Sequence, residues 1–322
     1  MTLLLTHQDV QSAVTMGDAI RAMEDAFMEE AGGGVLLPPR INMKAGRGWL
    51  RVGPVVMEKS GWMGFKAMNL TPGHGVRYQV HLYCVDTGEL VAVMDAQHLT
   101  TLRTGATSAV ATRLLAKPGA CDVAVLGSGP EARAQLEAMH VAGFVREARI
   151  FSPTPANRKR LAEEFQANGV RARDVGSAEE AVSGADLVVA AVKSTQSVFF
   201  GRWLRPGMHV NSVGTARRDQ REIDPETFQR SKCIVVDSKE GVFGEAGDAV
   251  AARDALHEDN VHDLAALVAG KAPGRTSADD ITLFKSVGTG IQDIAIAAVI
   301  YKRAREKGLG RDLGEFPYLK RQ

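Results

Sequence analysis

Three small residues with a fixed spacing, Gly127, Gly129 and Ala132, mark the stretch whose chemistry is clearest. They follow the apolar run Val123–Leu126 and open an alanine-rich segment with helical periodicity, which is the G-x-G-x-x-A pattern between a strand and a helix. Gly127 permits the tight turn, Gly129 lets a pyrophosphate approach the backbone, and Ala132 allows close helix–strand packing. An ordinary glycine-rich turn would not need both flanks, so we predict a dinucleotide site at the helix N-terminus.

The next predicted strand, Ala148–Ser152, ends without the acid that usually holds the ribose hydroxyl of NAD. Ser152 and Thr154 can instead donate to a 2′-phosphate, and Arg158 can pair with it. Arg158 is equally well explained as a solvated charge, so the sequence favours NADP only slightly and leaves NAD open. The predicted cofactor contacts, which include the ends of later strands, are Gly127, Ser128, Gly129, Pro130, Ser152, Thr154, Arg158, Val192, Val213, Ser286 and Val287.

Three cations, Arg40, Lys66 and Arg103, precede this turn and suit a substrate that carries a carboxylate. Lys66 stands in an apolar strand context, where an unpaired ammonium is costly, so it needs an anionic partner or a lowered pKa. The alternatives are an edge-strand charge for Lys66 and a surface ion pair for Arg103. His74 and His81 are further candidates for binding the substrate, although single histidines are more often structural.

Two kinds of architecture must position these residues. The segment Val35–Val93 carries short strand-like runs with a hairpin turn at Asp86–Gly88, which indicates antiparallel pairing. A helix is expected over His98–Leu115. Strands and helices then alternate, which predicts an α/β fold with a doubly wound, Rossmann-type parallel sheet, beside this second, α+β region.

Composition excludes several classes of function. The chain has 322 residues, a formal net charge of +1 and 45% hydrophobic residues, which does not favour nucleic acid or membrane as partners. Its three cysteines are far apart, no signal peptide is recognisable and no apolar run reaches transmembrane length, so we expect a cytoplasmic protein. The eight histidines lack metal-ligand spacing, so we predict no metal.

The chain resembles the ornithine cyclodeaminase/mu-crystallin family in six segments that occur in the expected order. They are Gly64–Met68 (GFKAM), Glu89–Asp95 (ELVAVMD), Leu99–Ser108 (LTTLRTGATS), Leu126–Pro130 (LGSGP), Asn211–Gly214 (NSVG) and Phe284–Asp293 (FKSVGTGIQD). The resemblance implies a split substrate-binding and dimerisation domain of residues 1–118 plus 303–322, with a dinucleotide-binding domain of residues 119–302. It also implies a homodimer formed through the sheet of the split domain.

The resemblance also implies roles for individual residues. It places Arg40, Lys66 and Arg103 on the substrate carboxylate and Thr104 on a cofactor phosphate. Ala216 stands where cyclodeaminases carry a catalytic Asp, and Asp219 aligns with the Asp of the ketimine-reductase branch. This departure favours a reductase over ornithine cyclisation.

We therefore expect NAD(P)H-dependent reduction of a small α-imino acid to the L-amino acid, with Lys66, Arg103 and Asp219 as catalytic residues. The imino acid is either an open-chain dicarboxylate such as iminosuccinate or a cyclic ketimine such as pyrroline-2-carboxylate. The open alternatives are a cyclodeaminase-type lyase with recycled NAD, an alanine dehydrogenase-like enzyme, and a non-catalytic cofactor-binding protein. Either Lys66 or Asp219 would handle the proton of the substrate nitrogen.

Overall fold

The computed structural model describes residues 2–119, 121–256 and 258–320. They form two compact units, the first ending at Arg103 and resuming at Thr289, the second spanning Thr104–Gly288. These boundaries differ from those expected at residues 118/119 and 302/303. The difference arises because helix α11 (Gly290–Lys307) packs along its length on strands β4, β5 and β6 of the first unit, while helix α3 (Gln97–Leu115) continues through the first boundary.

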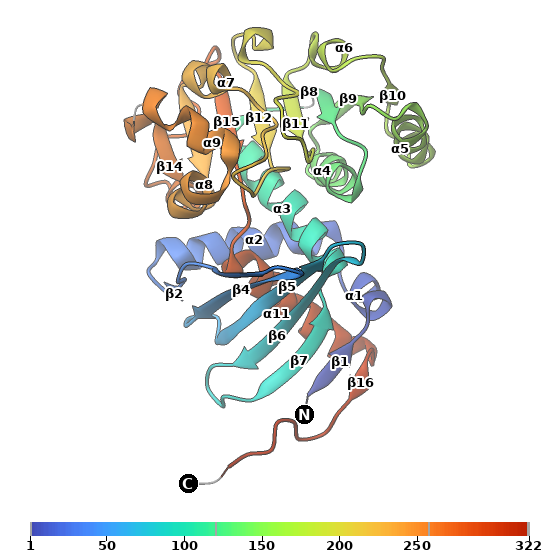
Figure 1. The fold of residues 1–322 in the computed structure, drawn as a ribbon, viewed down its shortest axis with the longest axis vertical. Helices are drawn as coiled ribbons and strands as arrows, with labels where there is room; N and C mark the ends of the chain where they lie inside the picture. Colours follow the sequence, from blue (N-terminus) through green and yellow to red (C-terminus); the bar gives the residue numbers. More distant parts are fainter. Residues whose placement is uncertain (1, 120, 257, 321–322) are drawn as a thin grey trace. The chain divides into compact units, whose positions relative to one another are not determined.

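The second unit is built on a parallel sheet with the strand order β10-β9-β8-β11-β12-β15-β13-β14, which confirms the predicted fold class (Figure 1). From β8 the chain proceeds to β9 and β10 on one side and to β11 and β12 on the other. The point of reversal lies between β8 and β11, and ligands of such sheets bind outside the carboxyl ends of the strands there. The strands are β8 (Cys121–Leu126), β9 (Val145–Phe151), β10 (Ala172–Asp174), β11 (Leu187–Ala190), β12 (His209–Ser212), β13 (Cys233–Val236), β14 (Val261–Asp263) and β15 (Thr282–Lys285).

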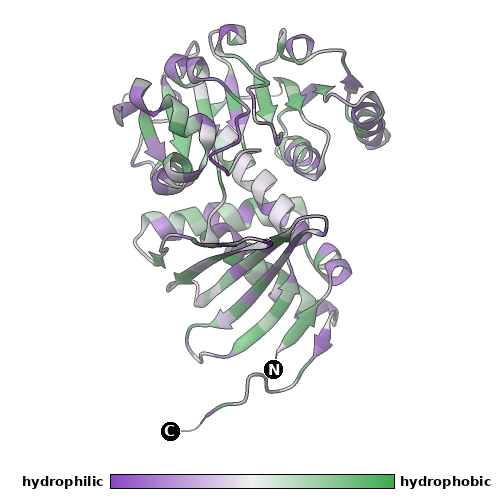
Figure 2. Ribbon diagram, in the orientation of Figure 1, coloured by the Kyte–Doolittle hydropathy of each residue, from purple (hydrophilic) through white to green (hydrophobic). Residues whose placement is uncertain are grey.

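Strands β11 and β13 of this sheet are apolar on both faces, as is typical of a parallel sheet covered by helices, whereas β12 and β15 also bury polar side chains. All residues of β11 and β13 are buried, and the strands are largely green in Figure 2. Helix α3 is nearly white in the same figure because it consists mainly of Ala, Gly, Ser and Thr. The other helices are α4 (Pro130–Val141), α5 (Pro155–Ala167), α6 (Ala178–Val182), η1 (Gly201–Trp203), α7 (Pro225–Arg230), α8 (Lys239–Glu245), α9 (Gly247–Ala252), η2 (Arg253–Ala255), η3 (Glu258–Asn260) and α10 (Leu264–Val268).

The first unit is built on a mostly antiparallel sheet with the order β16-β1-β7-β6-β5-β4-β2, and β3 also pairs with β4. The antiparallel pairing predicted for Val35–Val93 is confirmed, whereas the sequence did not single out the short strands β2, β3 and β16. Strand β16 pairs with β1, which places the start of the tail on this unit, and residues 321 and 322 lie outside the described part. The strands are β1 (Leu3–Leu5), β2 (Val35–Leu36), β3 (Ile41–Ala45), β4 (Gly48–Met57), β5 (Trp62–Thr71), β6 (Gly75–Cys84), β7 (Leu90–Asp95) and β16 (Arg311–Asp312).

Three helices cover one face of this sheet. Helix α1 (His7–Ala13) contacts β7, α11 contacts β4 to β6, and α2 (Met16–Ala31) packs on α11. Thr15 and Asp18 form a capping box at the start of α2. Lys66 is on the helix-covered face, because Gly64 lies two residues earlier on β5 and a Cβ there would come within 3.0 Å of Ile294 on α11.

The opposite face of the same sheet is apolar and partly exposed. Phe65 points to this face because successive strand residues alternate, and it is paired directly with His81 on β6. We call this surface the open face, and it consists of Phe65 and the residues on neighbouring strands that point to the same side of the sheet. Its apolar residues include Leu36, Ile41, Met43, Leu50, Val52, Pro54, Val56, Met63, Phe65 and Tyr83. Ile41 and Met43 are 52% and 50% exposed, which is unusual for side chains of this size.

Candidate functional site

The turn after β8 fits a dinucleotide phosphate. Gly127 has φ +123°, and a Cβ there would lie 2.6 Å from the carbonyl oxygen of Ala191, so a side chain is excluded. Gly129 is the N-cap of α4 with no side chain capping the helix, and a Cβ at this position would meet nothing within 4 Å. No side chain caps the start of α4 and the space beside Gly129 is open, which suits a pyrophosphate bound at the helix N-terminus.

The end of β9 is organised by hydrogen bonds among the predicted residues. Ser152 is buried, and its hydroxyl lies 2.8 Å from that of Ser128. Arg158 donates from Nη1 to the carbonyl of Ser152 at 2.9 Å, and its Nε lies 3.5 Å from a carboxylate oxygen of Asp174 on β10. Thr154 is the exposed N-cap of α5 and does not cap it through its side chain. Arg158 is thus held by the protein, while the hydroxyl of Thr154 remains available to a ribose or its phosphate.

Helix α3 carries Thr104 into the second unit against α4. A Cβ at Gly105 would lie 2.5 Å from the carbonyl oxygen of Ala134, so the two helices approach closely. Thr104, one residue earlier, is 7% exposed. Gly105 therefore allows a close helix contact, which places Thr104 near the helix that begins at the phosphate turn.

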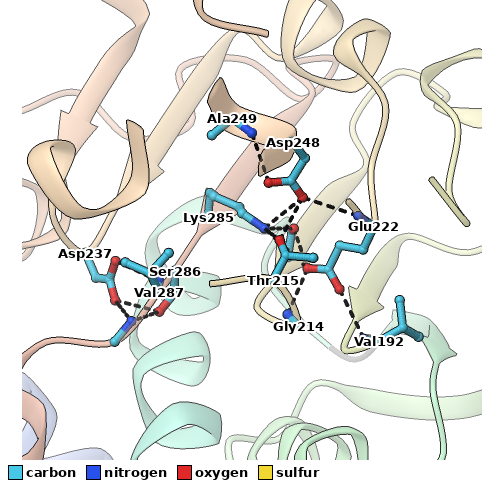
Figure 3. Close-up of polar contacts among 12 residues, drawn as sticks. Val192, Gly214, Thr215, Glu222, Asp237, Asp248, Ala249, Lys285, Ser286 and Val287 are labelled. Carbon is cyan, nitrogen blue, oxygen red and sulfur yellow. Dashed lines mark hydrogen bonds and ion pairs between the residues drawn. The ribbon is translucent and has the colours of Figure 1, made fainter. Parts of the chain in front are cut away.

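The remaining predicted cofactor residues lie at the carboxyl ends of the parallel strands. Val192 follows β11, Val213 follows β12, and Ser286 and Val287 follow β15. Asp237, which the sequence did not single out, accepts the Ser286 hydroxyl at 2.6 Å and the Val287 N–H at 3.2 Å (Figure 3). This carboxylate fixes the turn after β15.

The first unit brings together cations that the sequence selected. Lys66 Nζ lies 2.8 Å from Oδ1 of Asp293, and Arg103 Nε lies 3.1 Å from the same oxygen. Arg103 also donates from Nη1 to Gln292 at 2.8 Å. The side chains of Lys66, Arg103 and Asp293 are 12%, 7% and 6% exposed. We call Lys66, Arg103 and Asp293 the carboxylate cluster, after the substrate carboxylate that Lys66 and Arg103 are expected to bind.

Arg40 reaches the same face of the sheet. Its Cγ and Cδ lie 3.6 and 3.7 Å from where a Cβ of Gly53 would stand, and Gly53 pairs directly with Lys66. The absence of a side chain at Gly53 therefore lets the stem of Arg40 lie across the strand beside Lys66. All three predicted carboxylate-binding cations are thus gathered on one side of the sheet.

The surroundings of Lys66 lower the pKa of its ammonium to about 8. Burial is the main cause, the nearby charges of Arg103 and Arg40 act in the same direction, and Asp293 opposes them. The ammonium also lies 5.9 Å from the centre of the Tyr78 ring. Lys66 can therefore change its charge close to neutral pH, which an exposed lysine does not do.

The two histidines proposed for substrate binding are not brought to the carboxylate cluster. His81 pairs with Phe65 and stacks on its ring at a centroid distance of 4.7 Å, so it points to the open face while Lys66 points to the other. Burial lowers the pKa of His81. His74 is exposed in the turn between β5 and β6.

Asp219, the predicted acidic residue, lies in the loop between β12 and α7 of the second unit. Its carboxylate forms a two-pronged contact with Arg217, whose Nε donates to Oδ1 at 2.9 Å and whose Nη2 lies near Oδ2 at 2.5 Å. The side chain of Asp219 is 60% exposed. Asp219 is paired with Arg217 in this arrangement, and its part in proton transfer remains a prediction.

Asp293 was not predicted as a site residue, although it ends the family-like segment Phe284–Asp293. The signal was available, because a buried Lys66 needs an anion and Asp293 is the acid in the first turn of an apolar helix. Within residues 2–119, 121–256 and 258–320, no group of three or more His, Cys, Asp or Glu side chains is arranged to hold a metal ion. None of the described helices has both the length and the apolar character needed to cross a bilayer.

The model of the ornithine cyclodeaminase/mu-crystallin family matches residues 1–308. The chain belongs to this family. Two relatives illustrate its range. An alanine dehydrogenase of Archaeoglobus fulgidus is 31% identical over 322 residues, covering 98% of this chain and 99% of the relative. The ketimine reductase mu-crystallin of Mus musculus is 31% identical over 283 residues, covering 85% and 87%.

Three solved structures share the fold of this family member. A Delta(1)-pyrroline-2-carboxylate reductase of Thermococcus litoralis, in complex with NADH and L-proline, has a TM-score of 0.92 at 35% identity and covers 97% of this chain and 100% of its own. An archaeal alanine dehydrogenase dimer with bound NAD has a TM-score of 0.92 at 31% identity, with 98% and 99% coverage. The iminosuccinate reductase of Paracoccus denitrificans, in complex with NAD+, has a TM-score of 0.90 at 25% identity, with 96% and 98% coverage. The family and fold class expected from the sequence are confirmed.

Proposed function

We propose that this chain is an NAD(P)H-dependent reductase that converts a small α-imino acid to the L-amino acid. The observation that carries the proposal is the carboxylate cluster, in which Lys66 and Arg103 share one oxygen of Asp293 beside Arg40. The same chain carries a turn shaped for a dinucleotide. Its relatives include reductases and dehydrogenases of imino and amino acids, and three similar structures contain NAD or NADH.

Each site residue would have its own role in the proposed reaction. Arg40 and Arg103 bind the substrate carboxylate by charge-assisted hydrogen bonds and orient the C=N bond. Lys66, with a pKa of about 8, either adds a third hydrogen bond to this carboxylate or supplies the proton of the imine nitrogen. The nicotinamide cofactor, when bound at Gly127–Pro130, supplies the hydride. Asp219 would stabilise the positive charge of the iminium group.

The geometry favours a substrate with one carboxylate, such as a cyclic ketimine, over the dicarboxylate iminosuccinate. A second carboxylate needs its own cations when it leaves water. Arg77 and His81 lie on the open face, and Arg217 is engaged with Asp219. On the face of Lys66, Arg51 lies one pair along the strand, and its Nε already donates to Asn42 at 2.7 Å. We therefore place pyrroline-2-carboxylate ahead of iminosuccinate.

A substrate panel tests this proposal. Proline, pipecolate, alanine, aspartate and ornithine are assayed for reduction of NAD+ and NADP+ at alkaline pH, and the matching imines for oxidation of NADH and NADPH. We expect a cyclic imine to be reduced at least about tenfold more efficiently than iminosuccinate, because the second carboxylate would be desolvated without a dedicated partner. Aspartate as the best substrate, with activity lost in Arg51→Gln, would contradict the proposed substrate class.

The panel also separates the alternatives. A cyclodeaminase releases ammonia from ornithine with no net change in NADH, and Ala216 at the position of its Asp speaks against this outcome. An alanine dehydrogenase-like enzyme oxidises alanine in preference to proline. A binding protein binds NADH and turns over none of the substrates. Comparison of NADH with NADPH shows whether Thr154 and Arg158 serve a 2′-phosphate, since a large preference for NADH would exclude this role.

We further propose that two copies of the chain associate through the open face. Its large apolar side chains are half exposed at Ile41 and Met43, and a similar archaeal alanine dehydrogenase is described as a dimer.

We also propose a cytoplasmic location, because Cys84, Cys121 and Cys233 are free thiols, which persist in a reducing compartment. Recovery of the protein from a secreted fraction would contradict this location.

A charge placed on the open face is expected to break the dimer. Met43→Glu should shift the protein from dimer to monomer in light scattering after size exclusion, because a carboxylate buried between apolar surfaces is costly. Val141→Glu is the control, since Val141 is similarly exposed, at 49%, but lies at the end of α4 in the second unit. A monomeric wild-type protein, or a Met43→Glu variant that stays dimeric at the same concentration, would place the interface elsewhere.

A further inference from the structure

A fully buried lysine stands at the carboxyl end of β15. The ammonium of Lys285 lies 2.8 Å from the hydroxyl of Ser212, 2.6 Å from that of Thr215 and 3.0 Å from Oδ2 of Asp248 (Figure 3). It also lies 3.4 Å from Oε1 of Glu222. The side chains of Lys285, Glu222 and Asp248 are all 0% exposed, so three ionisable groups share one fully buried site.

Such a group is a poor way to gain stability. Each buried ion loses several kcal/mol of hydration, and replacement of buried ion pairs by apolar residues of the same size is often neutral or stabilising. Burial accordingly raises the pKa of Glu222, while Lys285 opposes this shift. The arrangement is better explained by the one conformation that it imposes on the backbone around it.

Glu222 reaches out of the cluster to two neighbouring strand ends. Its Oε2 accepts the N–H of Val192 at 3.1 Å, in the segment after β11, and its Oε1 accepts the N–H of Gly214 at 2.8 Å, in the segment after β12. Oε1 also accepts the Ser212 hydroxyl at 2.6 Å. The two segments touch, because a Cβ at Gly214 would lie 2.2 Å from the carbonyl oxygen of Val192. One carboxylate therefore ties both segments together.

The tied segments lie on one side of the point where the strand order reverses. The phosphate turn and Ser152 follow β8 and β9, whereas Val192 and Gly214 follow β11 and β12. A dinucleotide bound across this point has its adenosine half toward β9 and its nicotinamide half toward β11 and β12. The backbone that Glu222 holds is therefore the part of the sheet edge that a nicotinamide ring would meet.

We propose that Glu222, held by Lys285 and Asp248, is a positioning residue that shapes the nicotinamide half of the cofactor site without touching the cofactor. This inference rests on the proposed function, because it presupposes a nicotinamide dinucleotide. It assigns the cluster a role in ligand geometry, and Lys285 acts in it as the internal counter-ion that keeps Glu222 in place.

The test compares two ligands that differ only in the nicotinamide ring. Glu222→Gln turns one of two carboxylate acceptors into an amide donor facing a backbone N–H, so at least one strand end must move. We expect the dissociation constant of NADH, measured by calorimetry, to rise about tenfold or more, and that of ADP-ribose to change less than about threefold. The emission maximum of bound NADH should also shift, because the ring enters a different environment.

Two further variants make the result decisive. Ser212→Ala removes one hydrogen bond to Glu222 and one to Lys285 and should move NADH affinity in the same direction by a smaller factor, even where Glu222→Gln folds poorly. Asp224→Asn is the control, because Asp224 also accepts a backbone N–H, that of Gly201 at 2.8 Å, but caps α7. Equal weakening of NADH and ADP-ribose, or no change of either, would overturn the inference. A wild-type protein that binds neither ligand would instead contradict the proposed function.

Discussion

Replacement of Gly129 by valine should abolish cofactor binding while the protein keeps its fold. A Cβ at this position meets no atom of the chain within 4 Å, and the backbone of Gly129 has an ordinary extended conformation, so the folded state accommodates a side chain. The isopropyl group would occupy the space in which a pyrophosphate approaches the N–H groups of α4. Loss of two hydrogen bonds to a charged group corresponds to about 3–6 kcal/mol, which is more than about 100-fold in affinity.

Titration with NADH and with NADPH, together with the melting temperature, checks this expectation. Gly244→Val is the matched control, because Gly244 lies in the same unit and a Cβ there also meets nothing within 4 Å. It should bind the cofactor as the wild type does. Gly127→Val is a contrasting variant, since its Cβ would clash with the carbonyl of Ala191 and should lower stability as well. Unchanged nucleotide affinity in Gly129→Val would show that this turn is not the phosphate site.

The second large effect concerns the charge of Lys66. With a pKa of about 8, the Lys66 side chain is positively charged below about pH 8 and loses this charge as the pH rises above it. Binding of the substrate carboxylate should therefore weaken above about pH 8. Asp293 raises this pKa. Asp293→Asn should therefore move the loss of binding to lower pH, and Lys66→Arg should abolish the loss because guanidinium stays charged. Lys66→Ala should lower kcat/KM by about 10²–10³-fold through the loss of a buried charged partner.

The measurement is the pH dependence of the inhibition constant of pyrrole-2-carboxylate, a planar anion whose charge is constant from about pH 6 to 10. Asp293→Glu keeps the negative charge and should restore part of the wild-type profile. Glu306→Gln on the same helix removes a carboxylate that lies 3.9 Å from Arg303 at the surface, and it should leave the profile unchanged. Identical profiles for wild type, Asp293→Asn and Lys66→Arg would remove Lys66 from carboxylate binding.

The nucleotide half of the molecule was predictable because its signals are local. The glycine spacing at Gly127–Ala132 and the alternation of strand and helix each depend on neighbouring residues, and the structure confirms the parallel sheet they predict. The short strands β2, β3 and β16 have too few residues to show a period, and they exist only because β4 and β1 offer them partners.

Residues that depend on distant contacts were harder to find. His81 was chosen for its type, but the face it occupies is set by the β5–β6 register, in which Thr71 pairs with Gly75 across the turn and Phe65 therefore with His81. Asp293 reaches Lys66 only because α11, 227 positions later in the chain, lies on the sheet. The boundaries of the two units differ from the expected ones for the same reason, because α11 packs on the sheet of the first unit.

The buried cluster around Lys285 combines both kinds of information. A lysine at the end of a buried apolar strand predicts a counter-ion close to its ammonium. Which acid supplies it cannot be read from the sequence, because Glu222 and Asp248 are 63 and 37 positions away and lie in irregular or short helical segments. The need for a partner was visible in the sequence, whereas its identity required the fold.

The central claim, hydride transfer to the α-carbon of an imino acid, is tested most directly by isotope transfer. The purified protein is incubated with pyrroline-2-carboxylate and NADH that carries two deuterium atoms at C4 of the nicotinamide, and the product is analysed by mass spectrometry and NMR. The account predicts L-proline with one deuterium at its α-carbon and one NADH oxidised per proline formed. Intact NADH with no labelled amino acid from this or any other imine of the panel would contradict it.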